Sequence, residues 1–442
     1  MPPAHSPRVV GFGAHTAAVG DLVNSLYAIG ASARPSTDDP TPIGAGTADP
    51  PAAAAADPSP GLTSVTAHMD ALATGRLRGV VSVDPDGKTA LVQGRCSMAR
   101  LVAVLAPRGI MPLTTPAATG LTLGGAVTRT SVGASSFATG EFATSVRELE
   151  LLAPCGEVVV ARPDGPYGDL FAEVIARDGP TDHLIVAARI ALREAEEFVA
   201  TRQVGATNSR ELAGALTGIV RDGTWEGEAV DFLEAVSWGP TRHIMSLGRM
   251  ISAAEAPCHA VKPSRYDAGG PPFAQTLTPG ATDLMRLPDF LTRWEPDGFW
   301  RSFHYGLGHR AVRRMWPTRL RTPATYARID AFWDGPAQAL DGLARRRHGA
   351  RVFREVCVPV AALADFVESA AGIAPGVPVW MALFPDTMDD AAPSPTGQPT
   401  MWAYCGLWGP GSHQRTGHAP ATEAAIDRLA EALGGRTVRA AA

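Results

Sequence analysis

Small and hydroxyl-bearing residues fill the stretch 111–140, the part of this sequence best suited to hold a ligand. Eight of them fall within eighteen positions: Thr122, Gly124, Gly125, Thr128, Ser131, Ser135, Ser136 and Thr139. Such residues bury little apolar area. Glycine lets a backbone approach a ligand, and bare N–H groups with hydroxyls can cradle an anion such as a diphosphate. A surface loop of small residues would have the same composition, so the residues alone leave both interpretations open.

A second set of candidates lies in the aromatic segment 293–317, in which we select Arg301, His304, Tyr305 and His309 as the titratable candidates. The segment predicts either an apolar pocket or a structural aromatic core. The residues concerned are Trp294, Phe299, Trp300, Phe303, His304 and Tyr305, and Trp380 is a further candidate to face a substrate. We select His304, Tyr305 and Glu234 as the catalytic residues that handle a proton.

Periodicity and turn residues predict the elements that position these side chains. Residues 80–83 and 89–93 predict a hairpin with a Pro-Asp-Gly turn, and Ser97 is expected to cap a helix that ends near Gly109. Further strands are expected at 144–153, 157–161, 229–238, 241–250, 351–360, 377–384 and 401–407, and helices at 15–29, 361–371 and 421–433. The stretches 32–62 and 251–281 are expected to be loops.

In this order the motifs resemble a known family. The stretches GVVSVDPDGKTALVQGRCSMARLVAVLAPRGIMPLTTPAATGLTLGGAV, SSFATG and VRELELLAPCGEVVVARPDG are similar to the FAD-binding domain of the vanillyl-alcohol-oxidase superfamily. Within it they resemble the Δ24-sterol-reductase-like flavoproteins, a branch with bacterial reductases of a methylene group on fatty acyl chains. The resemblance implies that TLGGAV lies against the diphosphate of FAD. The cofactor-binding residues it implies are Thr122, Leu123, Gly124, Gly125, Ala126, Ser135, Ser136 and Gly140.

The same resemblance implies an α+β fold in two parts. A two-part FAD-binding PCMH-type domain is expected over 1–192, with 32–62 as its flexible loop, and an α+β substrate (cap) domain over 193–415. A C-terminal helix within 416–442 is expected to return to the FAD domain. No flavin-linking motif occurs, so FAD is expected to be bound non-covalently.

Length and composition narrow the function classes. The 442 residues suit about two domains. A net charge of −5 and the lack of a long basic cluster argue against a nucleic-acid partner. Five scattered cysteines without a CxxC pair, no secretory signal and no long apolar run predict a cytoplasmic protein without a metal site or a transmembrane segment. Nothing in the sequence sets the oligomeric state.

Four departures from the family pattern bear on the cofactor. Relatives carry a cationic loop where this chain has Asp38 and Asp39, which would repel a phosphate. Arg129, Ser131 and Gly133 stand in the second loop, where relatives have glycines and a glutamate. The polar cluster at 178–183 replaces a glycine-rich turn. The chain also stops short of the tyrosine-bearing tail that relatives send back to the flavin.

The resemblance and the four departures from it leave two candidate functions. The first is an FAD-dependent oxidoreductase that moves a hydride between flavin N5 and a lipophilic small molecule, in C=C reduction or the reverse dehydrogenation, with NADPH as the hydride donor for a reduction. The second is a relative that has lost redox chemistry and acts as a redox-neutral, cyclase-like biosynthetic enzyme or as a non-catalytic partner. We favour the first because TLGGAV is kept and the resemblance extends over most of the chain, although one fold can host many chemistries.

Overall fold

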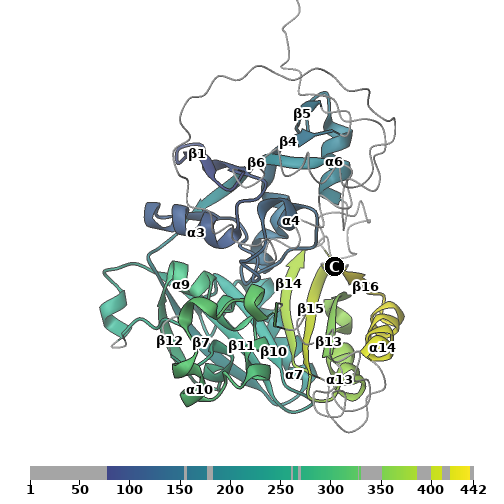
Figure 1. Cartoon of the computed structure of the whole chain (residues 1–442). Helices are drawn as coiled ribbons and strands as arrows, with labels where there is room; N and C mark the ends of the chain where they lie inside the picture. The colour runs from purple at the N-terminus through teal and green to yellow at the C-terminus, as the bar shows by residue number, and fades with distance from the viewer. Residues whose placement is uncertain are drawn as a thin grey trace, which may run out of the picture.

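The computed structural model describes residues 77–153, 157–176, 183–259, 262–266, 270–326, 328–329, 351–385, 400–410 and 419–438. The helix predicted at 15–29, the loop at 32–62 and residues 178–182 of the polar cluster lie outside these ranges. Within them, two antiparallel sheets combine with helices, which confirms the α+β class (Figure 1). One strand of the first sheet ends at Glu194, and the next strand along the chain, which belongs to the second sheet, begins at Phe198.

The first sheet has the order β1-β2-β6-β4-β5, and β3 pairs with β6 beside it. Its strands are β1 (Val80–Asp84), β2 (Thr89–Gln93), β3 (Ile110–Pro112), β4 (Val146–Leu152), β5 (Val158–Ala161) and β6 (Leu184–Glu194). The predicted β1–β2 hairpin is confirmed, and Asp84 Oδ1 accepts from Gly87 N at 2.9 Å in its turn. Helix α3 (Met98–Leu105) begins where predicted, since Ser97 caps it by accepting from Arg100 N.

Three short helical elements follow β3: two lie in the stretch 111–140, which we call the small-residue segment, and the third comes directly after it. They are α4 (Leu123–Val127), α5 (Ser136–Thr139) and η3 (Phe142–Ser145). Helix α4 packs against β6, whereas α5 packs against β14 (Val379–Pro385) of the second sheet. The segment therefore runs from one sheet to the other.

The second sheet has the order β12-β7-β11-β10-β14-β15-β13-β16. Its strands are β7 (Phe198–Ala206), β10 (Phe232–Ser237), β11 (His243–Ile251), β12 (Thr282–Arg286), β13 (Arg351–Pro359), β14, β15 (Met401–Pro410) and β16 (Arg436–Val438). The predicted pairing of two strands near 229–250 is confirmed by the β10–β11 ladder.

Strand alternation gives the second sheet two different faces. Along β10, Leu233 and Ala235 join an aliphatic core beneath α7 (Ser209–Asp222), α13 (Leu363–Ile373) and α14 (Ala419–Ala432). Phe232 and Val236 join an aromatic core on the opposite face. Glu234 has the same alternation as Phe232 and Val236, so its carboxylate belongs to the aromatic side.

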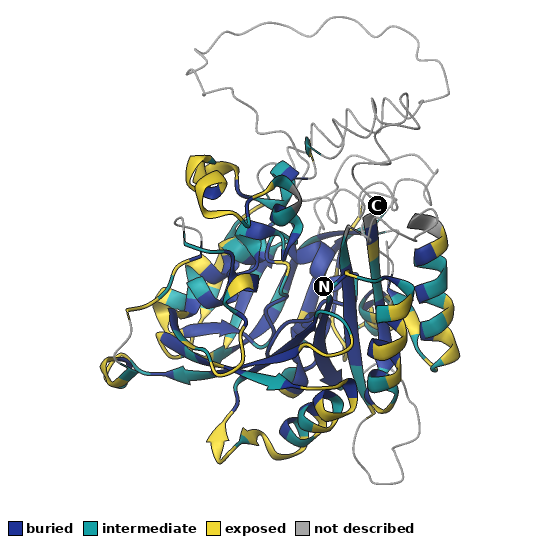
Figure 2. Ribbon diagram, turned by 90° about the horizontal axis from the view of Figure 1, so that it is seen from below, coloured by how far each residue is buried: buried dark blue, intermediate teal, exposed yellow. Residues whose placement is uncertain are grey.

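The remaining elements are mostly short. They are η2 (Ala106–Arg108), α6 (Gly168–Ala176), β8 (Thr224–Trp225), β9 (Glu228–Ala229), η4 (Ala256–His259), α8 (Phe273–Thr276), α9 (Leu287–Leu291), η5 (Glu295–Asp297), η6 (Arg301–Tyr305), α10 (Arg310–Met315), η7 (Thr318–Leu320) and η8 (Val360–Ala362). Figure 2 shows strands of the large sheet largely buried and helices exposed along their outer sides.

Two expectations about this half of the chain concern its C-terminal helix and the stretch 251–281. Helix α14 packs against α13 and against β13 and β16 of the second sheet (Figure 1). The return of this helix to the FAD domain stays a prediction. Strand β16 does approach the first part, where Arg436 Nη2 lies 3.9 Å from Glu141 Oε1. The stretch 251–281 is not simply a surface loop, because Tyr266 and Phe273 are buried in the aromatic core. The many prolines and glycines of this stretch predicted a loop and gave no sign that these two aromatic side chains are buried.

Candidate active site

The small-residue segment is buried where the two sheets meet. Thr114, Ser135 and Ser136 are each 2% exposed or less. Leu233 N of β10 donates to Ala134 O at 2.6 Å, and Phe137 packs into the aliphatic core of the second sheet. The surface-loop interpretation is therefore wrong. The segment is a buried junction, a position from which it can face a ligand held by either part.

Four main-chain amides of the TLGGAV turn donate hydrogen bonds to oxygen atoms of the chain itself. Leu123 N donates to Cys96 O at 2.8 Å, and Gly124 N donates to Gly94 O at 2.8 Å. Gly125 N donates to Thr122 Oγ1 at 3.3 Å, which makes Thr122 the N-cap of α4, and Ala126 N donates to Thr122 O at 2.9 Å. These four amides therefore already have partners within the chain. Contact of these residues with FAD through other atoms stays a prediction.

The other predicted cofactor residues hold the turn around α5. Ser135 Oγ donates to Leu113 O at 3.1 Å, and Ser136 Oγ accepts from Gly133 N at 3.0 Å. Gly140 ends the helix with a φ of 80°, a backbone conformation that favours glycine. These bonds fix the backbone of the junction, and no contact with a cofactor follows from them.

Gly133 is required by the chain itself. A Cβ at this position would lie 1.9 Å from Thr115 O, far inside any real contact. Ala117 N donates to Val132 O at 3.0 Å in the same place. The glycine thus allows two loop segments, at 115–117 and 132–133, to pack together, which does not require a ligand.

Three polar side chains in or beside the segment have buried atoms that fit an anionic cofactor. Thr115 Oγ1 and Ser131 Oγ have no hydrogen-bond partner among the described residues, nor do Nε and Nη2 of Arg193. Arg193 lies on β6 opposite Met111, at the start of the segment. Burial lowers the pKa of its guanidinium, and nearby Asp231 opposes this shift. Buried unpaired donors are costly, and hydroxyls with a guanidinium suit phosphate oxygens. These residues fit FAD better than the TLGGAV amides do.

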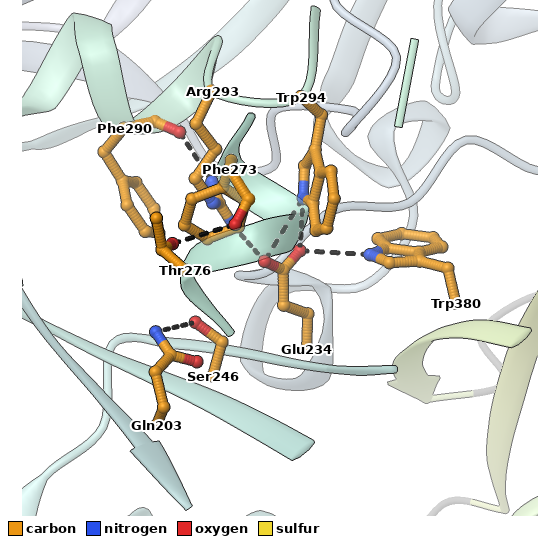
Figure 3. A network of polar contacts seen from close by, with 9 residues as sticks. All are labelled: Gln203, Glu234, Ser246, Phe273, Thr276, Phe290, Arg293, Trp294 and Trp380. Carbon is orange, nitrogen blue, oxygen red and sulfur yellow. Dashed lines mark hydrogen bonds and ion pairs between the residues drawn. The ribbon is translucent and has the colours of Figure 1, made fainter. Parts of the chain in front are cut away.

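Glu234 lies at the centre of a saturated network on the aromatic face (Figure 3). Arg293 Nη2 donates to its Oε1 at 2.5 Å. Trp294 Nε1 lies 3.2 and 3.0 Å from its two oxygens, and Trp380 Nε1 donates to Oε2 at 3.1 Å. Every partner is a donor, so both oxygens act as acceptors. The network therefore holds the carboxyl group in one position, and its role in proton handling stays a prediction.

The aromatic segment forms a core in the described structure. Trp294, Phe299 and Trp300 are at most 8% exposed. Trp294 stacks on Phe299 with ring centroids 4.9 Å apart, and Phe299 lies 5.5 Å from Trp380. These contacts favour the structural interpretation over a pocket at these residues. Trp380 is 1% exposed, and its Nε1 donates to the carboxylate of Glu234.

The two remaining proton candidates differ in what can be said of them. Tyr305 stacks on Tyr326 with centroids 5.4 Å apart and donates its hydroxyl to Tyr326 O at 3.1 Å. His304 belongs to η6, but its side chain lies outside the described structure. Their roles stay predictions.

Sequence reasoning missed Glu295, the carboxylate that lies against the small-residue segment. It opens η5, and its Oε2 accepts from Thr119 Oγ1 at 3.0 Å and from Gly120 N at 3.0 Å. No described cation lies within ion-pair distance of it. Burial raises the pKa of Glu295, while the hydrogen bonds from Thr119 and Gly120 oppose the rise. Its position in an acidic Glu-Pro-Asp turn gave no signal, because such turns are usually solvated.

Comparison with known proteins agrees with this arrangement. Residues 65–162 match the model of a family described as FAD binding domain. This part of the chain is similar to that family. Its described residues include the first hairpin, α3, α4, α5 and β4, so the small-residue segment lies within the family match.

Individual relatives are similar over part of their length. The chain is 28% identical to a Delta(24)-sterol reductase of Pisum sativum over 184 residues, which cover 40% of this chain and 32% of that protein. It is 27% identical to a decaprenylphosphoryl-beta-D-ribose oxidase of Mycolicibacterium smegmatis over 234 residues, or 52% of this chain and 46% of that protein. The matches thus span less than half of each relative.

Among the described residues, no helix has the length and apolar character needed to cross a membrane. The same residues contain no group of three or more histidine, cysteine or acidic side chains placed to hold a metal ion.

Proposed function

We propose that the protein is an FAD-dependent oxidoreductase that acts on a lipophilic small molecule, by C=C reduction or the reverse dehydrogenation. The observation that carries the proposal is the burial of an FAD-family segment against the second sheet, with Glu295 of the second part bonded to it. A substrate held by the second part would lie next to a cofactor held by the first. The names of the relatives, a sterol reductase and a polyprenyl-sugar oxidase, support the reaction type and the lipophilic substrate.

The chain's own residues would bind and orient a non-covalent FAD. Thr115, Ser131 and Arg193 are the donors we assign to its anionic part, because their buried atoms lack partners among the described residues. FAD, when bound, supplies hydride transfer at N5. NADPH is the hydride donor we propose for a reduction.

Glu295 is the residue we assign to proton handling at this junction. Burial raises the pKa of Glu295, so its carboxyl keeps a proton up to a higher pH than the carboxyl of an exposed glutamate does. Its partner Gly120 N holds it toward the small-residue segment. Glu234 accepts hydrogen bonds from Trp294 and Trp380 and orients both indoles.

The visible absorption spectrum of the purified full-length chain tests the proposal. We expect a flavin band, either as purified or after reconstitution with FAD and removal of excess cofactor. Anaerobic addition of NADPH should bleach that band if NADPH is the donor. A band that dithionite bleaches and NADPH does not would keep the flavoprotein and reject NADPH.

One observation favours the second candidate, a relative that has lost redox chemistry and acts as a redox-neutral enzyme or a non-catalytic partner. Four of the six TLGGAV amides, those of residues 123–126, are bonded within the chain. If the folded protein stays colourless after reconstitution, and FAD does not raise its thermal unfolding midpoint, the oxidoreductase proposal fails and this candidate replaces it.

A further inference from the structure

Helix α10 has its apolar side turned outward. The buried residue of this helix is Arg313. Its large apolar residues are exposed instead: Val312 by 39% and Met315 by 85%, and Leu320 just beyond the helix by 42%. A helix on a globular protein normally buries its apolar stripe, and clustered exposed apolar side chains mark contact sites.

Arg313 fixes this orientation. Its Nη1 lies 2.5 Å from Asp297 Oδ1, and its Nη2 lies 3.1 Å from Asp297 Oδ2. Its Nε donates to Gly270 O at 2.6 Å, and Nη2 also donates to Tyr266 O at 3.1 Å. A buried ion pair with two further carbonyl acceptors resists rotation of the helix, because turning it would leave a buried charge unpaired. The exposure of Met315 is therefore built into the fold.

The exposed side of α10 is also basic. Residues 310–320 read RAVRRMWPTRL, with four arginines and no acidic residue. Arg313 is neutralised by Asp297, which leaves Arg310, Arg314 and Arg319 on the exposed side. No ion pair joins these three to the described residues. A chain with a net charge of −5 thus carries a positive surface here, interleaved with apolar side chains.

This composition fits a lipid surface better than a protein partner. Exposed apolar side chains flanked by arginines can enter the boundary between headgroups and acyl chains while the guanidinium groups remain at the phosphates. Trp316, half-buried at the end of the helix, is a residue type that favours this boundary. A stable protein interface takes about 20 to 30 residues a side, and residues 310–320 provide about half of that.

We propose that residues 310–320, the α10 surface, dock on an anionic lipid bilayer, with Val312, Met315 and Leu320 inserted and Arg310, Arg314 and Arg319 at the phosphates. The inference goes beyond the proposed redox function and does not depend on it. A surface of this kind would hold the protein where lipophilic molecules are dissolved.

Co-sedimentation of the full-length chain with vesicles tests the proposal. We expect binding to vesicles of phosphatidylcholine with phosphatidylglycerol, weak binding to phosphatidylcholine alone, and a decrease as salt is added. Arg314→Glu should weaken binding roughly tenfold or more, because each basic residue near an anionic surface contributes. The pair Met315→Ser and Leu320→Ser should weaken it as well. Matched controls are Arg210→Glu and Val81→Ser, which alter an exposed arginine and a 56% exposed valine elsewhere.

Three results would overturn the proposal. The first is no binding of the unaltered chain to anionic vesicles at low salt. The second is binding that the control variants weaken as much as the α10 variants. The third is loss with Arg314→Glu but not with the serine pair, which would indicate a purely ionic contact without insertion. Far-UV circular dichroism checks that each variant is folded, and the salt and lipid dependence of the unaltered chain needs no variant.

Discussion

Two buried carboxylates of this protein have opposite surroundings. Glu234 accepts from Arg293, Trp294 and Trp380 within the aromatic face of the second sheet. Glu295 accepts from one hydroxyl and one amide of the small-residue segment, with no described cation beside it. A buried charge is tolerated when it is paired, and its energy then depends on both partners. A buried carboxyl without a cation responds to pH instead. The first arrangement serves stability, and the second is open to chemistry.

The largest expected effect comes from breaking the ion pair at Glu234. Arg293→Met removes the cation from a carboxylate whose side chain is 1% exposed. We expect a loss of about 3–5 kcal/mol in the free energy of unfolding, because an uncompensated charge remains buried. Urea denaturation measures it.

A surface pair supplies the matched control. Arg286→Met breaks the ion pair with Glu197, in which the side chains are 55% and 47% exposed. Its expected cost is within about 1 kcal/mol. If Arg293→Met costs no more than Arg286→Met, the Glu234 network is not the stabilising centre described above. Adding Glu234→Gln to Arg293→Met should recover part of the loss by removing the buried charge.

The sequence predicted the strands and helices around these two carboxylates better than it predicted the side-chain contacts that the carboxylates make. Alternation and turn residues identified β10 and β11, and the Ser97 cap identified α3, because those signals are local. Glu234 was selected, but its saturation by Arg293 and two indoles depends on segments 59 to 146 residues away. Glu295 gave no local signal, since its partners Thr119 and Gly120 lie more than 170 residues earlier. Likewise, glycines typical of a ligand loop can serve chain packing, as Gly133 does.

The second effect distinguishes Glu295 by its dependence on pH. Burial raises its folded-state pKa above the ordinary value of 4.5, so the folded state holds a proton that the unfolded state loses first. The stability gained from this proton is full below about pH 4.5 and is lost as pH rises through the folded pKa. Above the folded-state pKa the carboxyl of Glu295 is ionised while buried, which costs stability, and Glu295→Gln removes this cost. The variant should therefore exceed the parent chain in stability near pH 7, and the difference should shrink toward pH 4.

Urea midpoints at a series of pH values measure this difference. Glu368→Gln, which alters an exposed carboxyl on α13, controls for the loss of one negative charge. A difference between Glu295→Gln and the parent that is constant with pH would show that the carboxyl does not titrate differently in the folded state. Its assignment to proton handling would then lose its support.

The smallest effect on stability, and the most direct test of the cofactor, concerns two buried serines, one in the small-residue segment and one just after it. Ser131 Oγ has no partner among the described residues, whereas Ser145 Oγ donates to Phe142 O at 2.6 Å. Without FAD, Ser145→Ala should lower the free energy of unfolding by about 0.5–1.5 kcal/mol, and Ser131→Ala should leave it unchanged or raise it.

The affinity for FAD should show the opposite pattern, with Ser131→Ala having the larger effect. Ser131→Ala should weaken FAD binding roughly tenfold, the value of one hydrogen bond to a charged group. Ser145→Ala should bind as the parent does. Fluorescence titration with FAD and thermal unfolding separate the two serines, and equal FAD affinity in all three proteins would remove Ser131 from the cofactor site.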